Sequence, residues 1–73
     1  MTTRAKFICV SNVTNNEGDS DIRLEAVTSG SEENDSFFKY TPSGVLEIGI
    51  VNKKTASFFE VGGEYYIDIS RAN

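Results

Sequence analysis

The stretch "AKFICVSNV", residues 5–13, has apolar side chains on both of its alternating faces. Phe7, Cys9 and Ser11 fall on one face, while Ile8 and Val10 fall on the other. Successive side chains of a strand point to opposite faces of a sheet. The pattern therefore predicts a strand that is covered on both sides over part of its length.

The residues that follow predict a turn and a second strand. "TNNEGDS" (residues 14–20) is rich in Asn, Gly, Asp and Ser, which favour turns. In "DIRLEAVT" (residues 21–28), apolar and charged side chains alternate, with Ile22, Leu24 and Ala26 on one face and Arg23 and Glu25 on the other. This alternation predicts a half-buried strand.

The stretch "SGSEENDSFFKYTPSG" (residues 29–44) combines an acidic segment with an aromatic one. Its first part predicts a loop, and "SFFKY" (residues 36–40) has the composition of a strand. Phe38 and Tyr40 share the face expected to enter the core, while Phe37 and Lys39 share the other. "TPSG" has the proline and glycine positions of a β-turn.

The C-terminal third predicts a strand, a short helix and a last strand. In "VLEIGIV" (residues 45–51), Gly49 suggests a bend, a bulge or a close backbone approach. Asn52 is a suitable helix N-cap, and Gly62-Gly63 is expected to stop the helix. The helix is expected to pack its phenylalanines on the core, and the expected inward residues of this third are Leu46, Ile48, Ile50, Thr55, Phe58, Phe59, Tyr65, Ile67 and Ile69.

Together these elements predict a mainly β fold. We expect a small, strongly bent antiparallel sheet of five strands that curls into an OB-like or SH3-like barrel, with one short helix before the last strand. An open sheet packed on the helix is the alternative. A chain of 73 residues buries too little surface for two cores, so residues 1–73 are interpreted as a single domain.

The composition argues against an enzyme and against a metal or other cofactor. The chain has no histidine and one cysteine, which removes the common nucleophile-and-base pairs and zinc sites. Glu32, Glu33 and Asp35 lack the spacing of a calcium loop, and no phosphate-binding glycine motif occurs. Seven basic and eleven acidic residues give a net charge of -4, which disfavours duplex nucleic acid as a partner.

The sequence shows no membrane-spanning or secretion signal, which predicts a protein inside a cell. No apolar run is long enough for a membrane span, and "MTTRAKFICV" lacks the pattern of a secretion signal. The lone Cys9 has no partner for an internal disulfide, which agrees with a reducing compartment, and we interpret it as a small buried hydrophobe.

The candidate binding residues are those expected on outward faces and in the acidic loop. Phe37 and Tyr66 fall on the outward phase of their strands. The tentative binding set is Glu32, Glu33, Asp35, Phe37, Lys39 and Tyr66. Exposed aromatic rings suit either a protein interface or base stacking in a single-strand binder, and the net negative charge favours a protein. The alternative is that both rings pack under neighbouring loops and bind nothing.

The chain also resembles a group of small uncharacterised proteins of tailed bacteriophages. The likeness covers about residues 6–70. It is carried by Ser29-Gly30-Ser31-Glu32-Glu33-Asn34, Phe37-Phe38-Lys39, Thr41-Pro42, Gly44, Gly49, Val51-Asn52, Ala56, Phe59, Gly62, Glu64-Tyr65-Tyr66 and Asp68. The group typically has Phe-x-Pro-Gly before the paired tyrosines, where this chain has Phe59-Glu60-Val61-Gly62. The resemblance implies a phage origin and action in the cytoplasm of a bacterial host, and it implies no catalytic residues.

Three functions follow as hypotheses. The first is a non-enzymatic phage accessory protein that binds a host or phage protein. The second is a barrel that binds single-stranded nucleic acid or a nucleotide, with Phe37 and Tyr66 stacking and Lys39, Lys53 and Lys54 near phosphates. The third is a small capsid-decorating protein of the virion. A homo-oligomer would help so small a core by burying more apolar surface.

Overall fold

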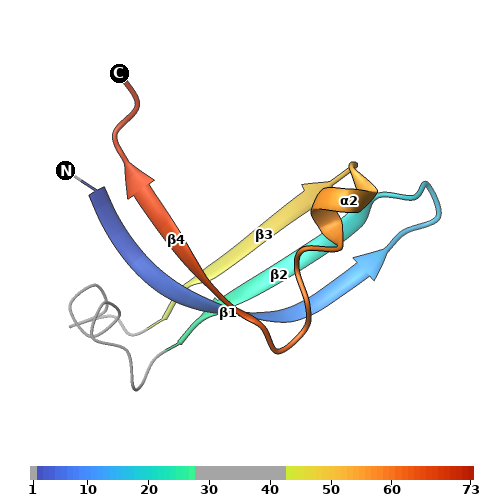
Figure 1. Ribbon diagram of the computed structural model, residues 1–73, viewed down its shortest axis with the longest axis horizontal. Coiled ribbons are helices and arrows are strands. Elements are labelled where there is room, and N and C mark those ends of the chain that lie inside the picture. The colour runs from blue at the N-terminus through green and yellow to red at the C-terminus, as the bar shows by residue number, and fades with distance from the viewer. Residues whose placement is uncertain (1, 28–42) are drawn as a thin grey trace.

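The computed structural model describes residues 2–27 and 43–73, which form a curled antiparallel sheet and one short helix (Figure 1). The elements are β1 (Thr2–Thr14), β2 (Ser20–Ala26), β3 (Val45–Ile50), α2 (Lys53–Ala56) and β4 (Glu64–Ser70). The strand order is β3-β2-β1-β4, so β3 and β4 are the two edges of the sheet that the described residues form. The mainly β half-barrel with a helix before the last strand is thereby confirmed. The strand predicted over residues 36–40 lies outside the described residues.

Strand β1 is the longest element and pairs with two neighbours. Residues 2–8 pair with β4, and residues 7–14 pair with β2. The ribbon of β1 curves strongly along its length (Figure 1). Because the two halves of β1 hold different partners, its curvature turns β4 relative to β2 and β3 and gives the sheet the shape of a half-barrel.

A β-bulge at Val10 changes which β1 residues face the core. Cys9 is opposite Leu24, but Ser11 is opposite Arg23, so β1 has one extra residue in this interval. A bulge of this kind resets the alternation of side chains. The prediction that Ser11 shares a face with Phe7 and Cys9 is therefore wrong, because Ser11 lies on the outer face with Arg23.

The core lies on the inner, concave face of the sheet. Its buried residues are Ala5, Phe7, Cys9, Ile22 and Leu24, with Ala56 of α2 buried nearby. Ala26, Leu46, Ile48, Ile50, Phe59, Tyr65 and Ile67 are partly buried against this cluster. These inward positions and the burial of Cys9 confirm the alternation expected from the sequence.

Two positions in the edge strands differ from what the sequence predicts. Ile69 of β4 is 52% exposed, because it pairs with Thr3 in a two-stranded ribbon that extends beyond β2. Gly49 pairs with Asp21 in regular register, so the bulge suggested at this glycine is absent from the described β2–β3 pair. A Cβ at Gly49 would meet only the Asp21 side chain at 3.8 Å, so no close backbone approach requires the glycine.

Helix α2 begins as predicted and ends earlier than predicted. The Asn52 Oδ1 atom accepts hydrogen bonds from the Lys54 and Thr55 amides at 2.9 and 3.1 Å. The helix ends at Ala56, so Gly62-Gly63 does not stop it. Gly62, with φ of 90°, instead forms the turn into β4 and donates its amide to the Cys9 carbonyl at 2.8 Å.

The short helix turns only part of its expected apolar face to the core. Ala56 is buried and Phe59 is half-buried, whereas Thr55 is exposed. Phe58 is 65% exposed. Because the chain leaves the helix after a single turn, the spacing that would bring Thr55, Phe58 and Phe59 onto one helical face does not apply.

Asn12 joins the end of α2 to β1. The bulge places Asn12 on the inner face opposite Ile22. Its Nδ2 donates to the Ala56 carbonyl at 3.0 Å and to the Phe59 carbonyl at 2.7 Å. One side-chain amide thus gives a second donor to the Ala56 carbonyl, which also accepts from the Phe59 amide at 3.1 Å, and a donor to the Phe59 carbonyl just beyond the helix.

We expect Asn12→Ala to destabilise the fold by about 1 to 3 kcal/mol, because it removes both hydrogen bonds and leaves two partly buried carbonyls without that donor. Urea denaturation followed by circular dichroism measures the change. Asn16→Ala, at an exposed position in the β1–β2 turn, is the matched control and should leave the midpoint nearly unchanged. Equal midpoints for the two variants would contradict this role of Asn12.

Candidate functional site

Of the predicted binding residues, the structure describes Tyr66. Glu32, Glu33, Asp35, Phe37 and Lys39 lie outside the described residues, and their role stays a prediction. Tyr66 lies on β4 with its ring on the outer face, 51% exposed, as its strand phase predicted.

Two cations of β1 flank the Tyr66 ring. The Arg4 Cζ and the Lys6 Nζ lie 5.1 and 5.5 Å from the ring centroid. Both are within the range of a cation–π contact. Tyr66 is therefore held by its own sheet, and its ring face already has cationic partners.

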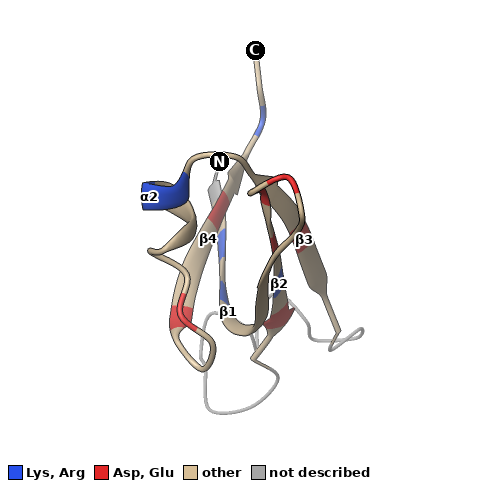
Figure 2. Cartoon of the chain, turned by 90° about the vertical axis from the view of Figure 1, so that its right-hand side faces the viewer, with Lys and Arg blue, Asp and Glu red and all other residues tan. Residues whose placement is uncertain are grey.

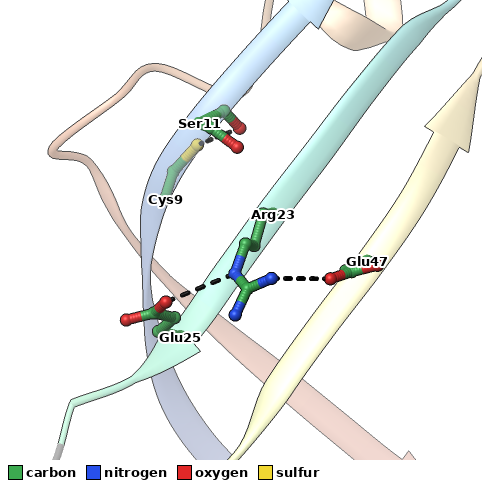
Figure 3. Close-up of polar contacts among 5 residues, drawn as sticks. All are labelled: Cys9, Ser11, Arg23, Glu25 and Glu47. Atoms are coloured by element: carbon green, nitrogen blue, oxygen red, sulfur yellow. Dashed lines mark hydrogen bonds and ion pairs between the residues drawn. The ribbon is translucent and has the colours of Figure 1, made fainter.

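Ion pairs connect the strands across the outer face. The Arg4 Nε donates to the Asp68 Oδ1 at 2.7 Å, and the Lys6 Nζ lies 3.9 Å from the Glu64 Oε1. Arg23 bridges two acids, with Nε donating to Glu25 at 3.3 Å and Nη1 donating to Glu47 at 2.8 Å (Figure 3). These bases belong to the inner strands β1 and β2, and Glu47, Glu64 and Asp68 belong to the edge strands (Figure 2).

The Arg4 guanidinium lowers the pKa of the Asp68 carboxyl. The hydrogen bonds from Arg4 are the largest cause, desolvation opposes them, and the charge of Arg4 adds to the lowering. The Asp68 side chain is 48% exposed, so solvent screens the pair.

The inner face opens into an apolar groove of about 420 Å³ between the two edge strands, which we name the β3–β4 groove. Its lining residues are Leu24, Leu46, Ile48, Phe58, Phe59, Glu64, Tyr65, Tyr66 and Ile67. The volume lies in the range of about 300 to 1,000 Å³ that binding clefts occupy. The sequence predicted several of these residues as core, but it did not show that the edge strands leave them beside an opening.

Three aromatic rings form one wall of the β3–β4 groove. The centroids of Phe58, Phe59 and Tyr65 are each 5.2 Å from the other two. The Tyr65 hydroxyl donates to the Phe58 carbonyl and accepts from the Glu60 amide, both at 2.8 Å. A Cβ at Gly63 would lie 2.9 Å from this hydroxyl, so a glycine is required for the close approach. The wall is therefore held in place before any partner arrives.

The described residues carry no arrangement that coordinates a metal. Within residues 2–27 and 43–73, no group of three or more His, Cys, Asp or Glu side chains converges. Cys9 is buried, with its Sγ 3.5 Å from the Ser11 carbonyl oxygen (Figure 3).

Comparison with known proteins adds no relative. No protein-family model matches the chain, and neither a curated protein nor a solved structure shows significant similarity to it. In the described part of the chain, no helix has the length and apolar character needed to cross a membrane.

Asp68→Asn should lower the stability of the fold at neutral pH and leave it unchanged in acid. The pKa of Asp68 is lowered in the folded state, so its contribution is present above the ordinary pKa of an aspartate and is lost as the pH falls through the lowered value. The denaturation midpoints of wild type and variant should therefore differ at pH 7, begin to converge below the ordinary aspartate pKa of 3.8, and become equal only when the pH is below the lowered value.

Asp21→Asn is the control for this measurement, because it removes an exposed carboxylate of β2 that makes no ion pair with the other described residues. A difference between wild type and Asp68→Asn that persists unchanged into acid would contradict the assigned role of the carboxylate.

Proposed function

We propose that this chain is a non-enzymatic module that binds another protein through the β3–β4 groove. The observation that carries the proposal is an apolar opening with a preformed aromatic wall, in which Phe58 is 65% exposed. Large exposed apolar side chains gathered in one place are typical of interaction sites. Aromatic rings in particular supply much of the binding free energy of protein interfaces.

The rigidity of the wall supports the same proposal. The Phe58 and Glu60 backbone groups are tied to the Tyr65 hydroxyl, and Asn12 holds the Phe59 carbonyl at 2.7 Å. A partner that contacts these rings has less conformational entropy to remove than it would on a loose loop. The groove is thus suited to binding without large rearrangement.

The proposed partner is a host or phage protein. The resemblance to small phage proteins supports this setting and the cytoplasm of the bacterial host as its location. The proposed architecture is an OB-like barrel: β1 is shared by two neighbours and a helix precedes β4, and a fifth strand would close such a barrel. The assignment of that strand to residues 36–40 remains part of the proposal.

We rank single-stranded nucleic acid below a protein partner. A phosphate backbone needs cations that it can neutralise. The chain has seven basic and eleven acidic residues, and its net charge of -4 opposes the approach of a phosphate backbone. The role as a virion protein stays a prediction that no contact in the structure favours.

Affinity capture from lysate of phage-infected bacteria, with the folded chain as bait, tests the proposal. Phe58→Ala should reduce recovery of the partner by about tenfold or more, since removal of a central aromatic anchor typically costs at least about 2 kcal/mol. Val51→Ala, at a position 76% exposed and outside the groove lining, is the matched control and should retain the partner.

Circular dichroism should show that both variants remain folded. Recovery of no stoichiometric partner by the wild type, or equal recovery by wild type and Phe58→Ala, would contradict binding at the β3–β4 groove.

A further inference from the structure

Both strands that border the β3–β4 groove are edges of the described sheet. Among residues 2–27 and 43–73, β3 pairs with β2 alone and β4 pairs with β1 alone. An edge strand presents a row of amide and carbonyl groups that can pair with another chain. The groove therefore adjoins backbone hydrogen-bonding groups as well as apolar side chains.

The lining of the groove places it alongside the β4 edge. Tyr65 and Ile67 reach it from the inner face of β4, and Glu64 and Tyr66 reach it from the outer face. Because alternate side chains of a strand point to opposite faces, a hollow that touches both sets lies beside the strand. An extended segment in this position would contact the edge of β4 and the apolar side chains together.

The charges on the outer face indicate which segment fits. The edge strands carry the acids Glu47, Glu64 and Asp68, while the bases that pair with them lie on β1 and β2 (Figure 2). Opposite charges on facing positions of neighbouring strands stabilise a sheet, and like charges destabilise it. A strand added at β4 would therefore fit best with basic side chains opposite Glu64 and Asp68.

We propose that the β3–β4 groove accepts an extended, basic segment of a partner protein as an added strand on β4. This inference rests on the proposed protein-binding function and specifies its partner. Glu64, Tyr66 and Asp68 share the outer face, while Tyr65 and Ile67 share the inner one. The segment thus carries Lys or Arg at two positions four residues apart, with apolar residues at the second and fourth of the five positions. Added strands of this kind gain affinity from backbone pairing and specificity from alternate side chains.

The test uses the full chain labelled with ¹⁵N and a synthetic peptide with a Lys-Val-Thr-Val-Lys centre. We expect peptide addition to shift and protect the amides of β4 in NMR and hydrogen-exchange measurements. The same peptide with Glu in place of Lys should bind about tenfold more weakly, because it would place like charges opposite Glu64 and Asp68. A peptide N-methylated on the amides that face β4 should lose binding.

Glu64→Lys should weaken binding of the Lys peptide by about two- to fivefold. Glu17→Lys makes the same charge change at an exposed position in the remote β1–β2 turn, and it should leave the affinity nearly unchanged. Thermal denaturation should show that both variants are folded.

The result that overturns the inference is an absence of shifts and protection at β4 with saturating Lys peptide. Pairing of β4 with residues 36–40 or with a second copy in the free chain, seen as cross-strand nuclear Overhauser contacts, would overturn it as well. If Phe58→Ala still abolishes capture of a partner in either case, protein binding at the groove stands without the added strand. If the peptide does not bind at β4 and Phe58→Ala does not reduce capture of a partner, the proposed function is contradicted too.

Discussion

The two-sided pairing of β1 is the constraint on which the rest of the structure depends. Its first half hydrogen-bonds with β4 and its second half with β2, so the bend of one strand sets the angle between the two parts of the sheet (Figure 1). The bulge at Val10 adds a residue and turns Asn12 toward α2. The pairing and the bulge of β1 therefore determine the curvature of the sheet and the position of α2.

The same constraint leaves β3 and β4 as the two described edges, so the part of the half-barrel formed by residues 2–27 and 43–73 has an open side. The buried core on β1 and β2 holds the sheet together, while the apolar residues of β3 and β4 are only partly covered. Ion pairs connect side chains on the outer face, where solvent reaches every pair, so each contributes little by itself. Strands β1 and β2 thus stabilise the sheet, while β3 and β4 carry the proposed binding surface.

The sequence predicted the regular parts of this architecture well. Strict alternation identified the inward residues of β2 and, in β4, Tyr65 and Ile67 but not Ile69; Asn52 marked the start of the helix, because both signals are local. The bulge at Val10 could not be predicted, since it arises from register between two strands that are paired across the sheet. The hydrogen bonds of Asn12 and the β3–β4 groove depend on that register and on curvature, so they had no local signal. Tyr66 is the predicted site residue that the structure places, and it lines the groove at the β4 edge.

Residue-by-residue hydrogen exchange of the free chain tests the central claim, an open side between β3 and β4, most directly. The account predicts slow exchange along the part of β1 that both neighbours cover, and alternation of slow and fast amides along β3 and β4, since each edge strand pairs on one side. Uniformly slow exchange along both edge strands would show that the side is already closed and would contradict the account.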